Sequence, residues 1–386
     1  MKKTLTDEKK YINETFCPYR VCPLGAHVDH QYGLVTGFAL DRGIKLNYVE
    51  TDDKSFHVVS RNFDGVLDFN LKDGLPKKIG HWGDFLVGAV WALSDKYEIK
   101  NGFQGIIEGT MPVGGLSSSA AVIITYLLTI CKCNDIHLTQ PQLIKYAIKV
   151  EREFIGVNVG KLDQSCEVYC KANHLLVLDT LDDKAELVPC SPNMPKFKIA
   201  IIYSGVSRKL AGSAYNLRVD ECKAAAYALK GYCGMEYGKF EETHLREVPY
   251  GAFEEYKEML PMNWRKRAHH YYHEQRRVES GVKAWRNGDI VEFGKAIFES
   301  GRSSIYQYEA GSEPLKVLYD IMTRTEGIYG GRFSGAGFNG CCMAIVDPEK
   351  EESIREYITT EYAKYFPEYM KEFVIEFCDT ADGVKY

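Results

Sequence analysis

The order of strand-like and helical segments predicts a protein of mixed α and β structure. Strand-like and helical runs alternate through the first half of the chain, an almost wholly helical stretch follows from about residue 209 to residue 324, and short strands then return. A chain of 386 residues with 45% apolar side chains exceeds the size at which one hydrophobic core usually stops growing. We therefore expect two domains or one large α/β unit.

Each expected element has a local pattern. Runs rich in β-branched and aromatic residues predict strands at residues 45–50, 56–60, 103–110, 175–178 and 197–203, and again at 332–334, 342–346 and 373–377. Apolar residues repeating every three to four positions predict helices at 82–96, 119–131 and 140–154, and at about 348–365. The change to a helical pattern places a domain boundary near residue 205, which gives domains 1–205 and 206–386.

Composition restricts the class of partner. A net charge of −5 leaves no basic surplus, which argues against nucleic acid or an anionic membrane and favours a small molecule. No apolar run follows the N-terminal lysines, and polar residues interrupt the most apolar stretch, 120–130, so neither a signal peptide nor a membrane span is expected. Several of the 12 cysteines lie in apolar segments, and none shows zinc-site spacing. Reduced thiols in a cytoplasmic protein are the expectation.

The segment GTMPVGGLSSSAA, residues 109–121, runs from a strand end through a glycine-rich turn into an apolar helix. Glycines allow a tight turn, and the free N–H groups at a helix start favour a phosphate. The alternative is an ordinary loop with a serine N-cap, although three consecutive serines exceed what one cap requires. The lysine of GxxxxGK[ST] is absent, so this is not the P-loop of the nucleotide hydrolases.

The segment GAGFNG, residues 335–340, formally matches the dinucleotide fingerprint GxGxxG. A strand follows it, however, where the fingerprint requires a helix. We interpret it as a glycine loop that lets the backbone approach either packed neighbours or a ligand.

The segment RVCPLGAHVDH, residues 20–30, gathers one cation, two imidazoles and one carboxylate around a glycine. Asp29 and His27 offer rigid hydrogen-bonding groups for sugar hydroxyls, and Arg20 suits a transferring phosphoryl group. A metal site of His27, Asp29 and His30 and a plain surface turn are the alternatives.

In this order and spacing, the three segments resemble the motifs of the GHMP kinases (galactokinase, homoserine, mevalonate and phosphomevalonate kinases), and of galactokinases in particular. The resemblance runs from about residue 18 to residue 346. Arg20, Gly25, His27 and Asp29 match the galactokinase pattern G-R-x-N-L-I-G-E-H-x-D. Residues 114–120 match the phosphate loop, 335–340 the C-terminal glycine loop, and 151–164 the pattern E-x-x-F-x-G-x-x-x-G-x-x-D-Q.

The resemblance implies an ATP- and magnesium-dependent kinase acting on the anomeric hydroxyl of a sugar. By this match Asp163 is the catalytic carboxylate, assisted by Arg20, and Ser119 and Glu151 hold magnesium. The residues implied to bind the ATP phosphates are Gly114, Gly115, Leu116, Ser117, Ser118 and Ser119.

The resemblance also implies that His27, Asp29 and Tyr215 contact the sugar, with Ala26 beside it. Galactokinases carry a glutamate at position 26, near the sugar C6 hydroxymethyl. Its loss suits a substrate with its own C6 carboxylate, because two like charges about 4 Å apart repel by roughly 4 kcal/mol at an effective dielectric near 20, about a thousandfold in affinity. The strings at 22–31 and 333–338 also resemble the galacturonokinase branch more than galactokinase.

We therefore expect D-galacturonate as the substrate and galacturonate 1-phosphate as the product. His27, His30 and Lys161 are candidates for binding the C6 carboxylate. One alternative is a galactokinase that forms galactose 1-phosphate, with the sugar O6 bonded through His27. Another alternative is a non-catalytic protein that senses sugar and ATP. The intact dipeptide of Ser119 and Ala120 argues against it.

Two departures from the galactokinase pattern affect loops. The phosphate loop is one residue shorter, and Asn339 replaces a glycine. Neither change removes a charged catalytic group.

The fold implied by the resemblance is α+β. The N-terminal domain would resemble domain 2 of ribosomal protein S5, and the C-terminal domain would be ferredoxin-like with added helices, with the active site in the cleft between them. The expected partner is a small-molecule sugar or uronic acid, with no nucleic acid and no membrane, and a monomer is expected before an oligomer.

Overall fold

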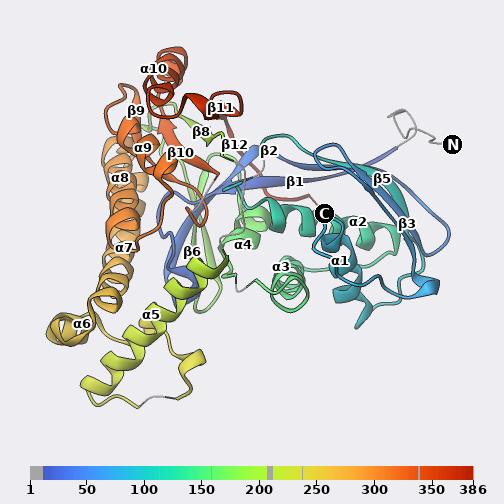
Figure 1. Cartoon of the computed structure of the whole chain (residues 1–386), viewed down its shortest axis with the longest axis horizontal. Helices are drawn as coiled ribbons and strands as arrows, with labels where there is room; N and C mark the ends of the chain where they lie inside the picture. Colours follow the sequence, from blue (N-terminus) through green and yellow to red (C-terminus); the bar gives the residue numbers. More distant parts are fainter. Residues whose placement is uncertain are drawn as a thin grey trace.

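The computed structural model describes residues 12–112, 114–157, 159–206, 212–236, 238–337 and 340–385, without the side chains of residues 212–214. Two β-sheets with helices packed on them make up the molecule (Figure 1). The mixed α+β class that the sequence predicts is therefore confirmed. The described residues include no helix with both the length and the apolar character needed to cross a membrane.

Within the described residues, eight strands form the first sheet in the order β4-β3-β5-β2-β6-β7, with β1 and β12 also paired to β2. All neighbours are antiparallel except β3 and β5. The strands are β1 (Asn13–Val21), β2 (Leu34–Glu50), β3 (Ser55–Ser60), β4 (Val66–Asn70), β5 (Phe103–Gly109), β6 (His174–Asp179), β7 (Lys184–Pro189) and β12 (Thr380–Ala381).

The 17-residue strand β2 holds this sheet together. Its first residues pair with β6 and its last residues pair with β5, while β1 runs antiparallel along most of its length. The pairing of β1 with β2 is irregular between Pro18 and Arg20, since proline cannot donate a ladder hydrogen bond. This irregularity comes directly before the residues of β1 that border the functional site.

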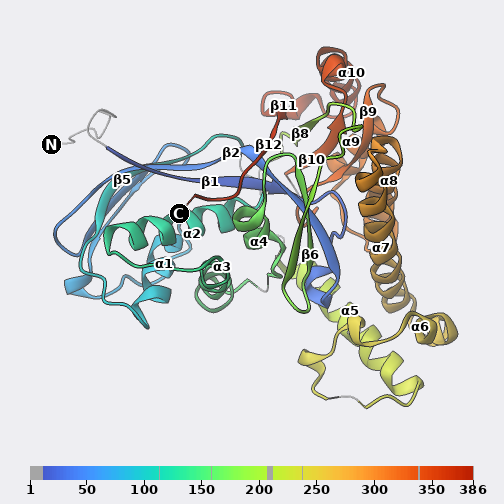
Figure 2. The same ribbon diagram turned by 180° about the vertical axis from the view of Figure 1, so that it is seen from behind.

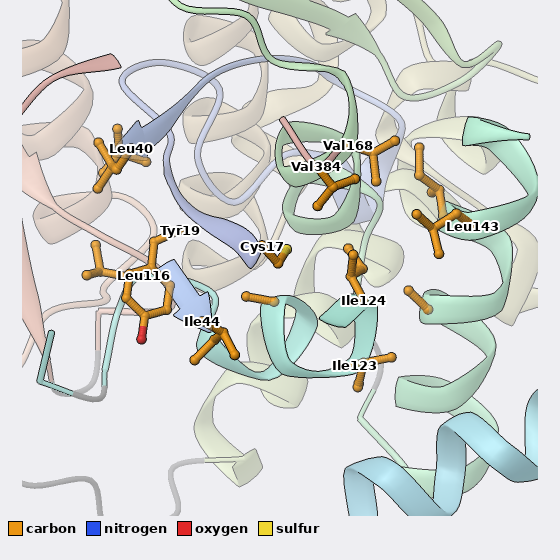
Figure 3. Packing of buried hydrophobic residues seen from close by; sticks show 14 of the residues in the cluster. Cys17, Tyr19, Leu40, Ile44, Leu116, Ile123, Ile124, Leu143, Val168 and Val384 are labelled. Atoms are coloured by element: carbon orange, nitrogen blue, oxygen red, sulfur yellow. The ribbon is translucent and has the colours of Figure 1, made fainter. Parts of the chain in front are cut away.

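Helices cover one face of the first sheet: α1 (Asp84–Ser94), α2 (Ser118–Cys133), α3 (Gln140–Lys149) and α4 (Leu162–Tyr169). Helix α2 is apolar around most of its circumference, as expected for a helix in the middle of a core. Figure 3 shows Ile123 and Ile124 of α2 close to Cys17, Ile44 and Leu143 from the elements around it.

The predicted helix over residues 140–154 changes its geometry part-way. Helix α3 ends at Lys149 and continues as a π-helical turn, η4 (Val150–Ile155). Single π-turns of this kind frequently occur at functional sites. The turn carries Glu151, one of the predicted site residues.

The second sheet has the order β11-β8-β10-β9, with all strands antiparallel. It consists of β8 (Lys198–Ser204), β9 (Ile328–Phe333), β10 (Cys341–Val346) and β11 (Phe373–Cys378). The helices of this half are α5 (Gly212–Tyr232), α6 (Tyr250–Tyr256), α7 (Met262–Asn287), α8 (Ile290–Tyr306), α9 (Glu313–Met322) and α10 (Glu351–Ala363). Helices α7 and α8 run side by side (Figures 1 and 2). Every residue of β10 is buried, so both faces of this sheet are covered.

The chain returns to the first sheet at its C-terminal end. Strand β12 pairs with β2, and Val384 packs in the first core near Val168 (Figure 3). Backbone hydrogen bonds from Gly383 and Val384 to α4 and the residue after it, of 2.7 and 2.8 Å, fix this segment. Strand β8, which precedes residue 205, belongs to the second sheet. The boundary at residue 205 therefore stays a prediction about domains. Strands from the two sides of this position pair with each other: β8 pairs with β10 and β11, and β12 pairs with β2.

Candidate active site

A cavity of ≈ 450 Å³ is lined by segments from both halves of the molecule. From the first half come the end of β1, the 22–31 loop, the 114–119 loop, η4 and the start of α4. From the second half come the start of α5, the end of β9 and the glycine loop at 335–340. The three segments that the sequence singled out, far apart along the chain, thus border one cavity.

Arg20 and Asp163 form a close ion pair at the cavity wall. The Nε and Nη2 atoms of Arg20 both lie 2.8 Å from Oδ1 of Asp163, and Nη1 donates to the carbonyl of Gly115 at 3.1 Å. Arg20 is 4% exposed and Asp163 is 27% exposed, so the carboxylate keeps access to the cavity. Burial opposes the charge of the guanidinium, but Asp163 outweighs this effect and raises the pKa of Arg20.

The 114–119 loop turns sharply into α2. Ser117 at the N-cap has a φ of 63°, and Gly115 a φ of 82°. Ser117, Ser118 and Ser119 all border the cavity at the positive end of the helix dipole, where backbone N–H groups lack helical partners. The loop thus has the features of an anion site.

Two of the predicted loop residues lie elsewhere. The side chain of Leu116 is buried in the first core (Figure 3), so only its backbone is available to a ligand. Gly114 is not part of the cavity lining and packs against the glycine loop.

The glycine loop supports the 114–119 loop by direct backbone packing. A Cβ on Gly340 would lie 2.7 Å from the carbonyl carbon of Gly114, and one on Gly335 would lie 3.1 Å from the Cα of Gly115. Ser334 also donates a hydrogen bond of 2.6 Å to the carbonyl of Gly115. Gly335 and Gly340 are therefore required because the backbone of the glycine loop packs directly on the backbone of the 114–119 loop. Asn339, which replaces a glycine of the galactokinase pattern in this loop, lies outside the described residues.

Ser119 and Glu151 lie together beside the ion pair. Ser119 Oγ donates to Oε1 of Glu151 at 2.8 Å, and the amide of Gln164 bonds the other carboxylate oxygen. Glu151 is 3% exposed, and burial, with the charge of Asp163, raises its pKa to about 7. A hydroxyl and a carboxylate are hard oxygen ligands, which suit a magnesium ion that also binds substrate phosphates.

His27 and Asp29 of the 22–31 loop also border the cavity. His27 has a φ of 60° and stacks on Tyr308 with a centroid distance of 4.4 Å, and its buried Nε2 has no hydrogen-bond partner in the described part of the chain. Burial, then the charge of Asp163, raises the pKa of Asp29 to about 6. Asp29 packs so closely on Gly160 that a Cβ there would lie 1.8 Å from Oδ2.

Tyr215 and His30 approach each other edge to face, with ring centroids 6.1 Å apart. Nε2 of His30 is 3.0 Å from the hydroxyl of Tyr308, which places Tyr308 between both histidines of the 22–31 loop. Tyr215 and Ala26 both border the cavity, and their contact with the substrate stays a prediction. His27, Asp29 and His30 do not form a metal site, since no group of three potential ligands occurs among the described residues.

Comparisons with known proteins identify the family. Residues 84–171 match the GHMP kinases N terminal domain, and residues 282–364 match the GHMP kinases C terminal model. The chain is 38% identical to a galacturonokinase of Arabidopsis thaliana, covering 94% of this chain and 89% of that protein. It is 31% identical to a galactokinase of Clostridium acetobutylicum, covering 98% and 95%. The chain belongs to the GHMP kinases.

Among solved structures, the Lactococcus lactis galactokinase complexed with galactose superposes with a TM-score of 0.88 at 26% identity, covering 99% of this chain and 96% of that one. The Methanococcus jannaschii mevalonate kinase, at 17% identity and a TM-score of 0.67, shares the fold. The GHMP kinase described here is thus a sugar kinase of the galactokinase and galacturonokinase group, a phosphotransferase that uses ATP.

Several residues that line the cavity of this kinase or support its walls were not found from sequence. Helix α7 holds the 22–31 loop from behind: His270 Nε2 is 2.9 Å from the carbonyl of Ala26, and Glu274 accepts a 2.8 Å hydrogen bond from the N–H of Gly25. Tyr308 and Arg332 are further examples. The spacing of His270 and Glu274, one helical turn apart on a buried face, is the signal that could have indicated the first two.

Proposed function

We propose that this kinase transfers the γ-phosphoryl group of ATP to O1 of D-galacturonate, giving galacturonate 1-phosphate. One observation carries the choice of substrate: Ala26 borders the cavity at the position where the galactokinase pattern has a glutamate. No carboxylate projects from this position, so a substrate carboxylate meets no like charge there. The name of the Arabidopsis relative agrees with this choice.

The reaction requires a base or orienting group near the sugar O1 and positive charge near the transferring phosphoryl group. In the proposed arrangement, Asp163 faces the anomeric hydroxyl and accepts its proton or orients its oxygen. Arg20, held against Asp163, stabilises the negative charge on the phosphoryl oxygens. Both groups lie at one end of the 114–119 loop, which binds the phosphates of ATP through its backbone N–H groups.

Ser119 and Glu151 would hold Mg²⁺. When bound, the ion neutralises charge on the ATP phosphates. Glu151 suits this role because its buried carboxylate lies beside Asp163 and close to the 114–119 loop, where a cation offsets the cost of burying negative charge.

At the sugar, Asp29 accepts hydrogen bonds from ring hydroxyls, and Tyr215 closes the same side of the cavity. His27, which also lines the cavity, lies next to the proposed position of the substituent at C6. Burial and the charge of Arg332 lower the pKa of His27, so that the ring is neutral and offers a hydrogen bond. Galactose is the second candidate, because a neutral His27 could equally bond a C6 hydroxyl and galactokinases are among the relatives.

A side-by-side assay of ADP release with galacturonate and with galactose tests the proposal. We expect the larger kcat/KM for galacturonate. Efficient turnover of galactose with none of galacturonate would show that the substrate assignment is wrong, and no ADP release with either sugar would contradict both candidate substrates.

The reciprocal variant is Ala26→Glu. It places a carboxylate about 4 Å from the proposed site of the substrate carboxylate, which should lower kcat/KM for galacturonate by up to about a thousandfold. Galactose turnover should change far less. Equal losses for both sugars would indicate a steric effect alone.

A further inference from the structure

A buried arginine, Arg332, and a partly buried one, Arg277, share one buried glutamate, Glu274, behind the 22–31 loop. Oε2 of Glu274 accepts a hydrogen bond from Nε of Arg277 at 2.7 Å, and Oε1 lies 3.9 Å from Nη1 of Arg332. Glu274 is 0% exposed, Arg332 1% and Arg277 13%. Burial opposes the ionisation of Glu274, but the charges of Arg277, His270 and Arg332 and a hydrogen bond from Ser300 together outweigh it and lower the pKa to about 2. All three side chains are therefore charged near neutral pH.

The other partners of these arginines are neutral. Arg332 donates to two serine hydroxyls at 2.6 and 3.0 Å and to a backbone carbonyl at 3.1 Å. Nη2 of Arg277 has no hydrogen-bond partner among the residues that the structure describes. His270, one turn before Glu274, is neutral, since burial lowers its pKa to about 4. One carboxylate thus faces two guanidinium groups, and the cluster keeps a surplus positive charge.

This cluster adjoins the part of the cavity where Ala26 lies. Arg332 borders the cavity together with Ala26 and His27. Its field reaches His27, where it is the largest cause after burial that lowers the pKa of the ring. Glu274 also binds the N–H of Gly25, directly before Ala26. The surplus charge and the substrate site are therefore only a few side chains apart.

Leaving a charge buried without a counter-charge costs several kcal/mol, so an anion is expected to approach it when the site is in use. The galactokinase pattern provides a glutamate at position 26, and this chain has alanine there. We propose that the surplus positive charge of Arg332, Arg277 and Glu274 selects a sugar with a carboxylate at C6, so that the substrate itself supplies the missing anion.

This inference rests on the proposed function and adds a cause for its selectivity. Arg332 is a positioning and specificity residue here, acting through its field, while His27 makes the direct hydrogen bond. Unit charges about 6 Å apart at an effective dielectric near 20 attract strongly enough to favour the uronate on the order of a hundredfold.

Three variants change the charge of the cluster in opposite directions. Arg277→Gln and Arg332→Gln each remove one positive charge, and Glu274→Gln removes the negative charge while keeping an acceptor oxygen for the N–H of Gly25. The measured quantity is the ratio of kcat/KM for galacturonate to kcat/KM for galactose. We expect the ratio to fall about tenfold or more in the two arginine variants and to rise in Glu274→Gln. Arg332→Lys, which keeps the charge, should stay within about threefold of the wild type.

A purely structural role for the cluster would reduce turnover of both sugars together. A ratio that is unchanged in all the variants, or that moves in the same direction in Arg277→Gln and Glu274→Gln, would overturn the inference. Arg277 is not part of the cavity lining, so its variant serves if Arg332→Gln does not fold. The wild-type assay separates the two proposals: a wild type that uses only galactose refutes the substrate, whereas a wild type that prefers galacturonate with unchanged ratios refutes only the electrostatic cause.

Discussion

Arg20 and Asp163, 143 residues apart in the chain, meet at the cavity wall with two guanidinium nitrogens 2.8 Å from one carboxylate oxygen. The side of Asp163 that faces the cavity remains accessible. This geometry holds the carboxylate in place while leaving an oxygen for the sugar, and it leads to the first prediction.

Asp163→Asn should fold and bind ATP but lose turnover by about 10²–10⁴-fold, the usual contribution of a positioned acid or base. The amide oxygen still accepts a hydrogen bond from Arg20, so the fold is kept. Circular dichroism, nucleotide binding and ADP release measure the three effects. The control is Asp182→Asn, on an exposed turn where the carboxylate pairs with Lys184, and it should have wild-type activity. Wild-type turnover in Asp163→Asn would refute the assigned role.

Ser119→Ala should raise the Mg²⁺ concentration needed for half-maximal activity by about tenfold, because it removes one of the two proposed ligands and the hydrogen bond that orients Glu151. A magnesium titration at saturating ATP and sugar measures this. Ser353→Ala, at an exposed position on α10, is the matched control. An unchanged magnesium requirement in Ser119→Ala would remove Ser119 from the metal site.

Gly160→Ala should raise the KM for the sugar at least tenfold while changing the KM for ATP little. The added Cβ would lie 1.8 Å from Oδ2 of Asp29, so the carboxylate must leave its position. The control Gly251→Ala adds a methyl group on α6, where nothing lies within 4 Å, and should be neutral or slightly stabilising. Equal increases in both KM values would point to a general distortion instead.

Glu167→Gln should stabilise the protein at neutral and alkaline pH. Burial, then the charge of Asp163, raises the pKa of Glu167 well above its usual 4.5. The carboxyl group is therefore neutral in the folded protein over a range where it is ionised in the unfolded chain. Its favourable contribution is complete below about pH 4.5 and is lost as the pH rises toward the folded pKa.

A glutamine side chain does not ionise, so its contribution to the free energy of unfolding does not fall as the pH rises. Thermal unfolding should show a midpoint a few degrees higher for Glu167→Gln at pH 8, with the difference disappearing near pH 4. A variant that is less stable than the wild type at pH 8 and equally stable at pH 4 would contradict the predicted direction of the pKa.

Sequence patterns predicted the elements that form continuous apolar runs in the core. Helix α2 and the strands β8 and β10 are examples. Strand β7 was missed because five of its six residues are exposed, which leaves no alternation to detect. Strand β1 was missed because it is stabilised by pairing with β2, which lies beyond the 22–31 loop, and this pairing leaves no pattern within the β1 segment itself.

The same distinction applies to the site. Ser117, Ser119 and Glu151 lie in local motifs, so the resemblance to galactokinases was sufficient to predict that they belong to one site. Tyr308 and Arg332 carry no local signal, because what matters is their packing against residues nearly 300 positions earlier in the chain. The surplus charge near Ala26 depends on the burial and partners of each side chain, which no sequence pattern contains.

The return of β12 to β2 has a consequence for biosynthesis. About 340 residues separate Leu40 from its partner Thr380. At the usual 5–20 residues per second, a ribosome needs roughly 20–70 seconds to make that distance. During this interval the short edge of β2 at Ala39 and Leu40 that β12 will occupy remains open, so the newly made N-terminal half keeps an exposed strand edge until synthesis is nearly complete.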